Sequence, residues 1–129
     1  MILIIDDQMP VAGIMARYLE RAGYMVAIAY NRNDALRQLP TLPHLQLVIL
    51  DVHVPHFDDG MAILAAVQQH LPRLPVLLLT GATSVIPGVG GVPSIPILYK
   101  PLPMYALVAA VQRMLAAPAL EAAHAYPTH

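Results

Sequence analysis

Short apolar runs alternate along the chain with longer segments in which apolar residues recur at helical spacing. The runs have the length of strands and carry almost no polar residue, which is typical of strands that are buried on both faces of a parallel sheet. They predict five strands, over residues 2–5, 25–29, 47–50, 76–79 and 97–99.

The segments between these runs predict four helices. Pro10 suits the first turn of the first helix, and Gly23 suits its end. Asn31 or Asn33 caps a short second helix, which Pro40 ends. The other bounds are expected at residues 11–22, 61–69 and about 103–116 for the first, third and last helices.

This alternation predicts an α/β fold with helices on both faces of a parallel sheet. Right-handed crossovers favour a doubly wound arrangement of five strands in the order 2-1-3-4-5. One segment departs from the pattern, because residues 81–99 hold four of the seven glycines, three prolines and no charge. Glycine costs about 1 and proline about 3 kcal/mol in a helix interior, so the helix between the last two strands is expected to be degenerate or missing.

Composition then limits the class of protein. The chain has 129 residues, enough for one domain, which we expect over residues 1–117 with a tail at 118–129. No apolar run approaches the ~20 residues of a membrane span, and Asp6 and Asp7 interrupt any secretory signal. The net charge of −1 argues against nucleic-acid and membrane partners, and cysteine is absent. We therefore expect a cytoplasmic protein.

Charged and hydroxyl side chains follow the predicted strands. Asp6 and Asp7 follow the first, Asp51 the third, Thr80 the fourth, and Lys100, the only lysine, the fifth. The carboxyl ends of parallel strands share one edge of a sheet, so these side chains are expected to converge. Close carboxylates need compensating cations, which Lys100 and Mg²⁺, an oxygen-seeking ion, would supply. Such a carboxylate can accept a phosphoryl group, and Asp51 is the candidate.

Four motifs in this order resemble the response-regulator receiver family of two-component signalling. The resemblance covers roughly residues 1–116. The motifs are Ile-Ile-Asp6-Asp7, Ile-Leu-Asp51-Val-His-Val-Pro55, Leu-Leu-Thr80-Gly and Tyr-Lys100-Pro101.

The resemblance implies a Mg²⁺ site built around Asp51, the phosphoacceptor. Asp7 would bind the metal directly, and Asp6 would act mainly through water. The backbone carbonyl of His53 would supply a further ligand.

The resemblance also implies how phosphate is held and where it comes from. Thr80 would bond a phosphoryl oxygen, Lys100 would pair with the phosphate, and the bond before Pro101 would be cis. The donor would be a histidine kinase or a histidine phosphotransfer protein. Such a domain is a signalling module and not an enzyme, apart from loss of its own phosphoryl group. Its donor is expected to dock on apolar residues beside the site, namely Met9, Pro10, Met15, Pro101, Leu102 and Pro103.

Three positions depart from the family pattern. Val54 replaces a methionine, Gly60 comes one residue late, and Ile97 stands where the family has an aromatic switch residue. We expect the phosphoryl chemistry to be kept and the usual relay from Thr80 to be altered. Few residues follow Ala116, so output is expected through protein contacts, a homodimer or onward phosphotransfer.

Other functions remain open on the sequence. A pseudo-receiver would keep the fold as a binding module and never be phosphorylated. A phosphatase of the haloacid-dehalogenase type also forms an aspartyl phosphate, but that family has a second aspartate where this chain has His53. His53, His56, Asp58 and Asp59 are interpreted as a solvated loop in preference to a transition-metal site.

Overall fold

The computed structural model describes the backbone of residues 1–81 and 95–125, and the side chains of residues 1–81 and 95–116. The predicted irregular crossover falls mainly on residues 82–94, outside the described part. The described elements are, in chain order, β1 (Ile2–Ile5), α1 (Met9–Arg21), β2 (Val26–Ala29), α2 (Arg32–Gln38), β3 (Leu47–Asp51), α3 (Phe57–His70), β4 (Val76–Thr80), β5 (Ile97–Tyr99) and α4 (Met104–Ala125).

The five strands form one parallel sheet in the order β2-β1-β3-β4-β5, which confirms the predicted fold class. In its register, Ile5 pairs with both Ala29 and Leu50. Thr80 pairs with Tyr99 at the far end of β4. The carboxyl ends of the strands are therefore aligned, and the residues that follow them share one edge of the sheet.

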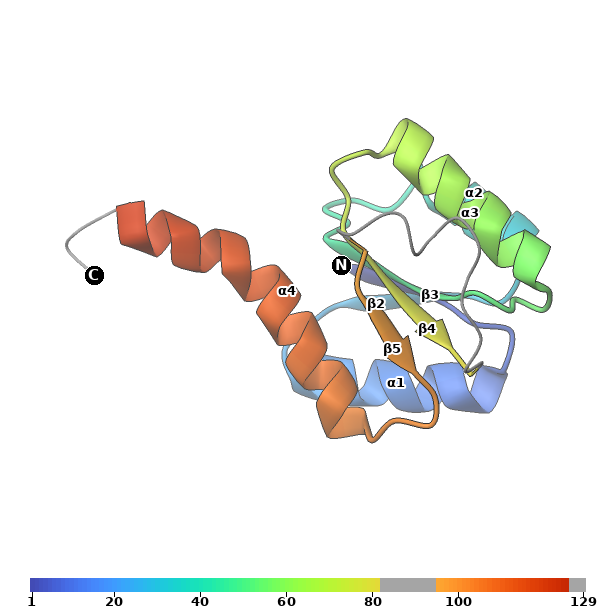
Figure 1. The fold of residues 1–129 in the computed structure, drawn as a ribbon, viewed down its shortest axis with the longest axis horizontal. Helices are drawn as coiled ribbons and strands as arrows, with labels where there is room; N and C mark the ends of the chain where they lie inside the picture. Colours follow the sequence, from blue (N-terminus) through green and yellow to red (C-terminus); the bar gives the residue numbers. More distant parts are fainter. Residues whose placement is uncertain (82–94, 126–129) are drawn as a thin grey trace.

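Helices cover both faces of the sheet and make two separate cores (Figure 1). On one face, α2 and α3 pack on alternate strand residues such as Leu3 and Leu50. On the other face, α1 and α4 pack on the intervening residues, such as Ile4 and Ile49. Burial on both faces explains why the central strands β1, β3 and β4 are almost wholly apolar.

Local signals fix several helix ends. The side chain of Asn31 accepts a hydrogen bond from the Asp34 backbone N–H at 2.8 Å, so Asn31 is the cap of α2. Gly23 takes a φ of +101° just beyond α1, a conformation that glycine reaches without steric cost. α4 continues beyond the predicted residue 116, and its second half extends past the sheet (Figure 1).

The start of α3 differs from the prediction. The helix begins at Phe57 instead of residue 61, and Asp58 and Asp59, which we interpreted as part of a loop, lie in its first turn. Acidic side chains interact favourably with the positive end of a helix dipole, which accounts for this earlier start. Apolar periodicity could not reveal this turn, because it contains one apolar residue among polar ones.

The described part of the chain contains no helix with the length and apolar character that crossing a bilayer requires.

Gly60 brings α3 against the end of β3. A Cβ atom at this position would lie 2.1 Å from the backbone oxygen of Val52, whereas one at Gly13 in α1 would meet nothing within 4 Å. We therefore expect Gly60→Ala to lower the free energy of unfolding by about 2 kcal/mol, since the backbone must shift. The matched change Gly13→Ala is expected to raise it by up to about 1 kcal/mol, because alanine favours a helix interior.

Urea unfolding of both variants, followed by circular dichroism, measures these changes. Equal effects of the two substitutions would contradict the close contact between α3 and Val52.

Candidate functional site

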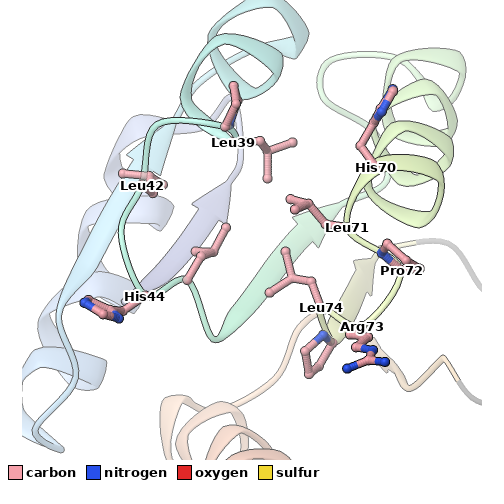
Figure 2. Close-up of a pocket in the computed structure, with 11 residues that line it drawn as sticks. Leu39, Leu42, His44, His70, Leu71, Pro72, Arg73 and Leu74 are labelled. Atoms are coloured by element: carbon pink, nitrogen blue, oxygen red, sulfur yellow. The ribbon is translucent and has the colours of Figure 1, made fainter.

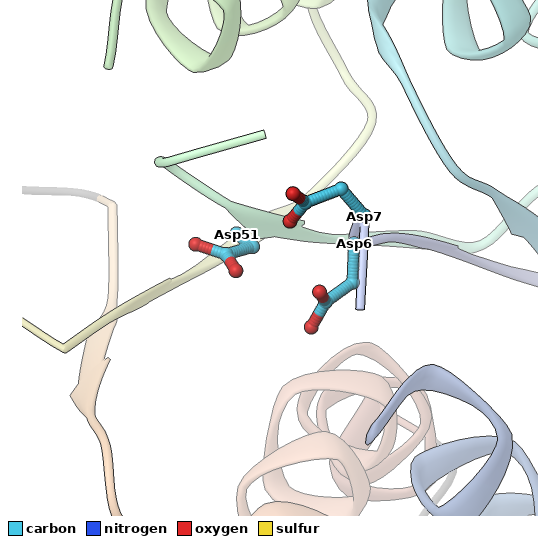
Figure 3. A group of neighbouring side chains, drawn as sticks. All are labelled: Asp6, Asp7 and Asp51. Atoms are coloured by element: carbon cyan, nitrogen blue, oxygen red, sulfur yellow. The ribbon is translucent and has the colours of Figure 1, made fainter. Parts of the chain in front are cut away.

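Three carboxylates meet at the carboxyl edge of the sheet. Oxygen atoms of Asp6, Asp7 and Asp51 lie within 4.8 Å of one another, and Figure 3 shows the three side chains grouped beyond the strand ends. Asp6 is fully buried and Asp51 is 6% exposed, while Asp7 is exposed. The site thus has a buried floor and one side open to solvent.

Lys100 joins two of these carboxylates. Its Nζ donates to Asp51 Oδ2 at 3.0 Å and to Asp6 Oδ2 at 3.4 Å. Its backbone N–H donates to the carbonyl of Thr80 at 2.7 Å. Because β4 lies between β5 and β3, the lysine side chain reaches across the end of β4 to arrive at Asp51.

Backbone N–H groups hold the other oxygens of the buried carboxylates. The N–H of Gln8 donates to Asp6 Oδ1 at 2.9 Å, and the N–H of His53 donates to Asp51 Oδ1 at 3.0 Å. Each carboxylate is therefore held on one side by the chain that follows it and on the other by Lys100. This arrangement fixes the orientation of Asp51 relative to its neighbours.

Burial and charge shift two ionisation equilibria. Burial raises the pKa of Asp6, although the hydrogen bond from Gln8 and the charge of Lys100 partly oppose the shift. For Lys100, burial alone would lower the pKa, but the hydrogen bond from its ammonium to Asp51 and the charges of Asp51 and Asp6 outweigh it, so the pKa is raised. The lysine is accordingly a permanent cation at neutral pH.

The donor set fits a hard divalent cation. In their ionised forms, three carboxylates and one ammonium leave a net charge of −2 in a small volume. All the side-chain ligands are oxygen atoms, and exposed Asp7 leaves room for the waters that Mg²⁺ retains. Asp6, Asp7 and Asp51 could hold such an ion.

The remaining predicted residues lie around this cluster. Thr80 is fully buried at the end of β4, next to the strand that carries Asp51. The His53 side chain is exposed, and its ring centroid lies 5.9 Å from that of Phe57. Ile97 is partly buried against the core beneath α2 and α3. The predicted cis bond before Pro101 is confirmed. A second cis bond, before Pro55, was not predicted from the sequence.

The proposed docking residue Met15 is in the wrong place for that role. It is 1% exposed and packs in the core between α1, α4 and the sheet. Its neighbour Ile14 is 50% exposed, and Met9 is 61% exposed. Both Ile14 and Met15 belong to the apolar stripe of α1, so helical spacing alone could not tell which of the two faces solvent.

A doubly wound sheet with an acidic cluster and a lysine at its carboxyl edge defines a receiver-like signalling domain. The family model of the response regulator receiver domain matches residues 2–112. The chain therefore belongs to the response-regulator receiver family, a phosphoacceptor signalling module of two-component systems.

Individual proteins are similar to this chain in sequence or in fold. The chain is 32% identical over 117 residues to the transcriptional regulatory protein ZraR of Salmonella typhimurium, covering 89% of this chain and 26% of that protein. The receiver domain of NtrX from Brucella abortus superposes with a TM-score of 0.77 at 25% identity, covering 91% of this chain and 99% of that one. A CheY-like receiver domain from Methanospirillum hungatei gives 0.80 at 23% identity, covering 93% and 96%. The chain thus spans about a quarter of the length of its curated relative.

The raised pKa of Asp6 predicts a stability effect with a defined sign. Because the folded state holds this proton more tightly than the unfolded state, its contribution to stability is present below pH 3.8 and lost as the pH rises through the folded pKa. We expect Asp6→Asn, without divalent cations, to raise the free energy of unfolding at pH 7.5 by about 1 kcal/mol. The gain should shrink toward pH 3.8.

Denaturant unfolding across this pH range measures the effect. A loss of stability in Asp6→Asn that is the same at every pH would mean that the hydrogen bonds of Asp6 outweigh the cost of burying its charge.

Proposed function

We propose that the chain accepts a phosphoryl group onto Asp51 from a histidine kinase or a histidine phosphotransfer protein, in a Mg²⁺-dependent reaction. The observation that supports this proposal is that Lys100 Nζ donates hydrogen bonds to both Asp51 and Asp6 within a cluster of three carboxylates. The phosphorylated domain then signals through protein contacts.

In the reaction, a carboxylate oxygen of Asp51 attacks the phosphorus of a phosphohistidine. A P–O bond forms as the P–N bond breaks, and the electron pair of that bond passes to the imidazole nitrogen, which takes up a proton. The product is an acyl phosphate. The fixed orientation of the Asp51 carboxylate supports this role, because less conformational freedom is lost when the carboxylate is aligned for in-line attack.

The other residues balance charge on the transferred group. Lys100 pairs with the phosphoryl oxygens, and the Thr80 hydroxyl hydrogen-bonds one of them. Asp6, Asp7, Asp51 and the backbone carbonyl of His53 would hold Mg²⁺, with Asp6 acting mainly through water. When bound, the ion would neutralise charge on the phosphoryl oxygens.

We also propose the setting in which this module acts. Residues 1–117 form the receiver domain, residues 118–129 lie outside it, and the protein is cytoplasmic. Its partners are the donor protein and an output protein or a second copy of the chain, without nucleic acid or membrane. Loss of the phosphoryl group to water ends the signal. The domain acts on its own acyl phosphate and does not turn over an external substrate.

Labelling with acetyl phosphate tests the phosphoacceptor directly. With Mg²⁺ present, we expect mass spectrometry to detect one added phosphoryl group, mapped to Asp51. Asp51→Asn and removal of Mg²⁺ with EDTA should each abolish it. Asp58→Asn, which changes an exposed carboxylate outside the cluster, should keep it. An unlabelled chain that still binds partners would instead support a pseudo-receiver.

An apolar face beside the site supports docking of the phosphodonor. Ile14 and Met9 on α1 are exposed, and Pro101 lies in the loop between β5 and α4. This face lies next to the phosphoacceptor, because α1 starts just after Asp6 and Asp7 and the loop contains Lys100. A donor helix lying against it would bring its phosphohistidine to Asp51.

We expect Ile14→Asp to slow phosphoryl transfer from a phosphorylated histidine kinase by about tenfold, because it introduces a charge into an apolar contact. Labelling by acetyl phosphate should be unchanged. Met25→Asp is the matched control, since Met25 is also exposed, at 69% against 50% for Ile14, and lies at the opposite edge of the sheet. Equal loss with both donors in Ile14→Asp would place the defect in the chemistry instead of in docking.

A further inference from the structure

A groove at the amino edge of the sheet is not used by the proposed phosphoryl chemistry. We infer that this groove, between the C-terminal ends of α2 and α3, binds an acidic, leucine-bearing helix of another protein. The inference is independent of the proposed function, because the groove and the phosphoacceptor lie at opposite ends of the strands.

The groove has an apolar floor. A hollow of about 610 Å³ opens between the loop before β3 and the loop before β4, with leucine side chains from both loops facing one another (Figure 2). A second hollow of about 460 Å³ runs between α2 and α3, and it shares Leu39, Pro40, His70 and Leu71 with the first. The two hollows therefore form one elongated groove.

The rim of the groove carries one arginine and two histidines. Arg73, His44 and His70 stand at separate points around the first hollow (Figure 2). Neither hollow is lined by an aspartate or a glutamate. Among the described residues, Arg73 has no salt-bridge partner. The four salt bridges between described residues involve Arg32, Arg37 and Lys100 instead. The groove thus offers unpaired positive charge beside apolar surface.

The shape and charge favour a helix over a small ligand. A compact molecule with one carboxylate would reach one of these three separated side chains and would leave the second hollow empty. An amphipathic helix can place leucines along an elongated apolar floor and acidic side chains at several points of its rim.

Among the side chains that the structure describes, none gives a second copy of this chain a complementary acidic surface. Asp34 and Asp59 already pair with arginines, and the three carboxylates of the site are held at the other edge. The described acidic side chains that remain, Glu20 and Asp58, lie on different helices. On these described side chains, the occupant is assigned to another protein.

A designed peptide probe tests the inference on the full chain. The probe is an amphipathic helix of about five turns, with leucines on one face and glutamates beside them. We expect amide chemical-shift changes confined to residues 36–45 and 66–75. A probe with lysine in place of every glutamate should bind at least about tenfold more weakly.

Variants of the chain complete the test. Arg73→Glu should weaken binding of the acidic probe by about tenfold, because an attraction becomes a repulsion. The exposed Arg113 lies outside the groove, so Arg113→Glu should leave binding unchanged. Circular dichroism and urea unfolding of both variants should match those of the unchanged chain, which shows that they are folded and separates this test from that of the proposed function.

Several results would overturn the inference. They are equal binding of the acidic and basic probes, shifts centred on α1 or β5, absence of binding at about 1 mM, and binding of decanoate in the groove without binding of the peptide.

Discussion

The site depends on the charged hydrogen bonds that the ammonium group of Lys100 donates to Asp6 and Asp51. Asp6 and Asp51 are both buried and share a cluster with Asp7, so without a cation their charges would repel in a region that water screens poorly. Lys100 donates to one oxygen of each and lies at the end of a different strand. A single side chain thereby ties the geometry of β5 to that of β1 and β3.

That tie works because the sheet fixes the ends of its strands. Parallel pairing aligns β1, β3, β4 and β5, and a strand that slipped by one residue could draw a polar residue at its end, such as Asp6, into an apolar core. Asp51 is the last residue of β3, and Thr80 is the last residue of β4. The polar residues of the site therefore begin where the two apolar cores end, and the stability of these cores maintains the distances between them.

The sequence was sufficient for the fold and for the convergence of charged side chains at one edge of the sheet, because both depend on local patterns. Apolar runs of strand length identified all five strands, and topology then required Asp6, Asp51 and Lys100 to meet. It was insufficient where neighbours decide the outcome. Met15 and Ile14 share one apolar stripe, yet only packing against α4 buries the first. The groove at the amino edge could not be predicted either, because residues from two loops and two helices line it and no single motif contains them.

The two ends of α3 connect the site with the groove. The helix begins after Pro55, in the loop that follows Asp51, where Gly60 lies against Val52, and it ends at His70 on the groove. A helix of this length spans about 20 Å. If it moves as a rigid body, a displacement of its first turn also displaces its last turn. If phosphorylation displaces that turn, then binding at the groove and phosphorylation of Asp51 are linked, and each changes the equilibrium of the other by the same factor. The tight contact at Gly60 is the point at which such a displacement would have to begin, because it leaves α3 no room to move unless the end of β3 moves with it.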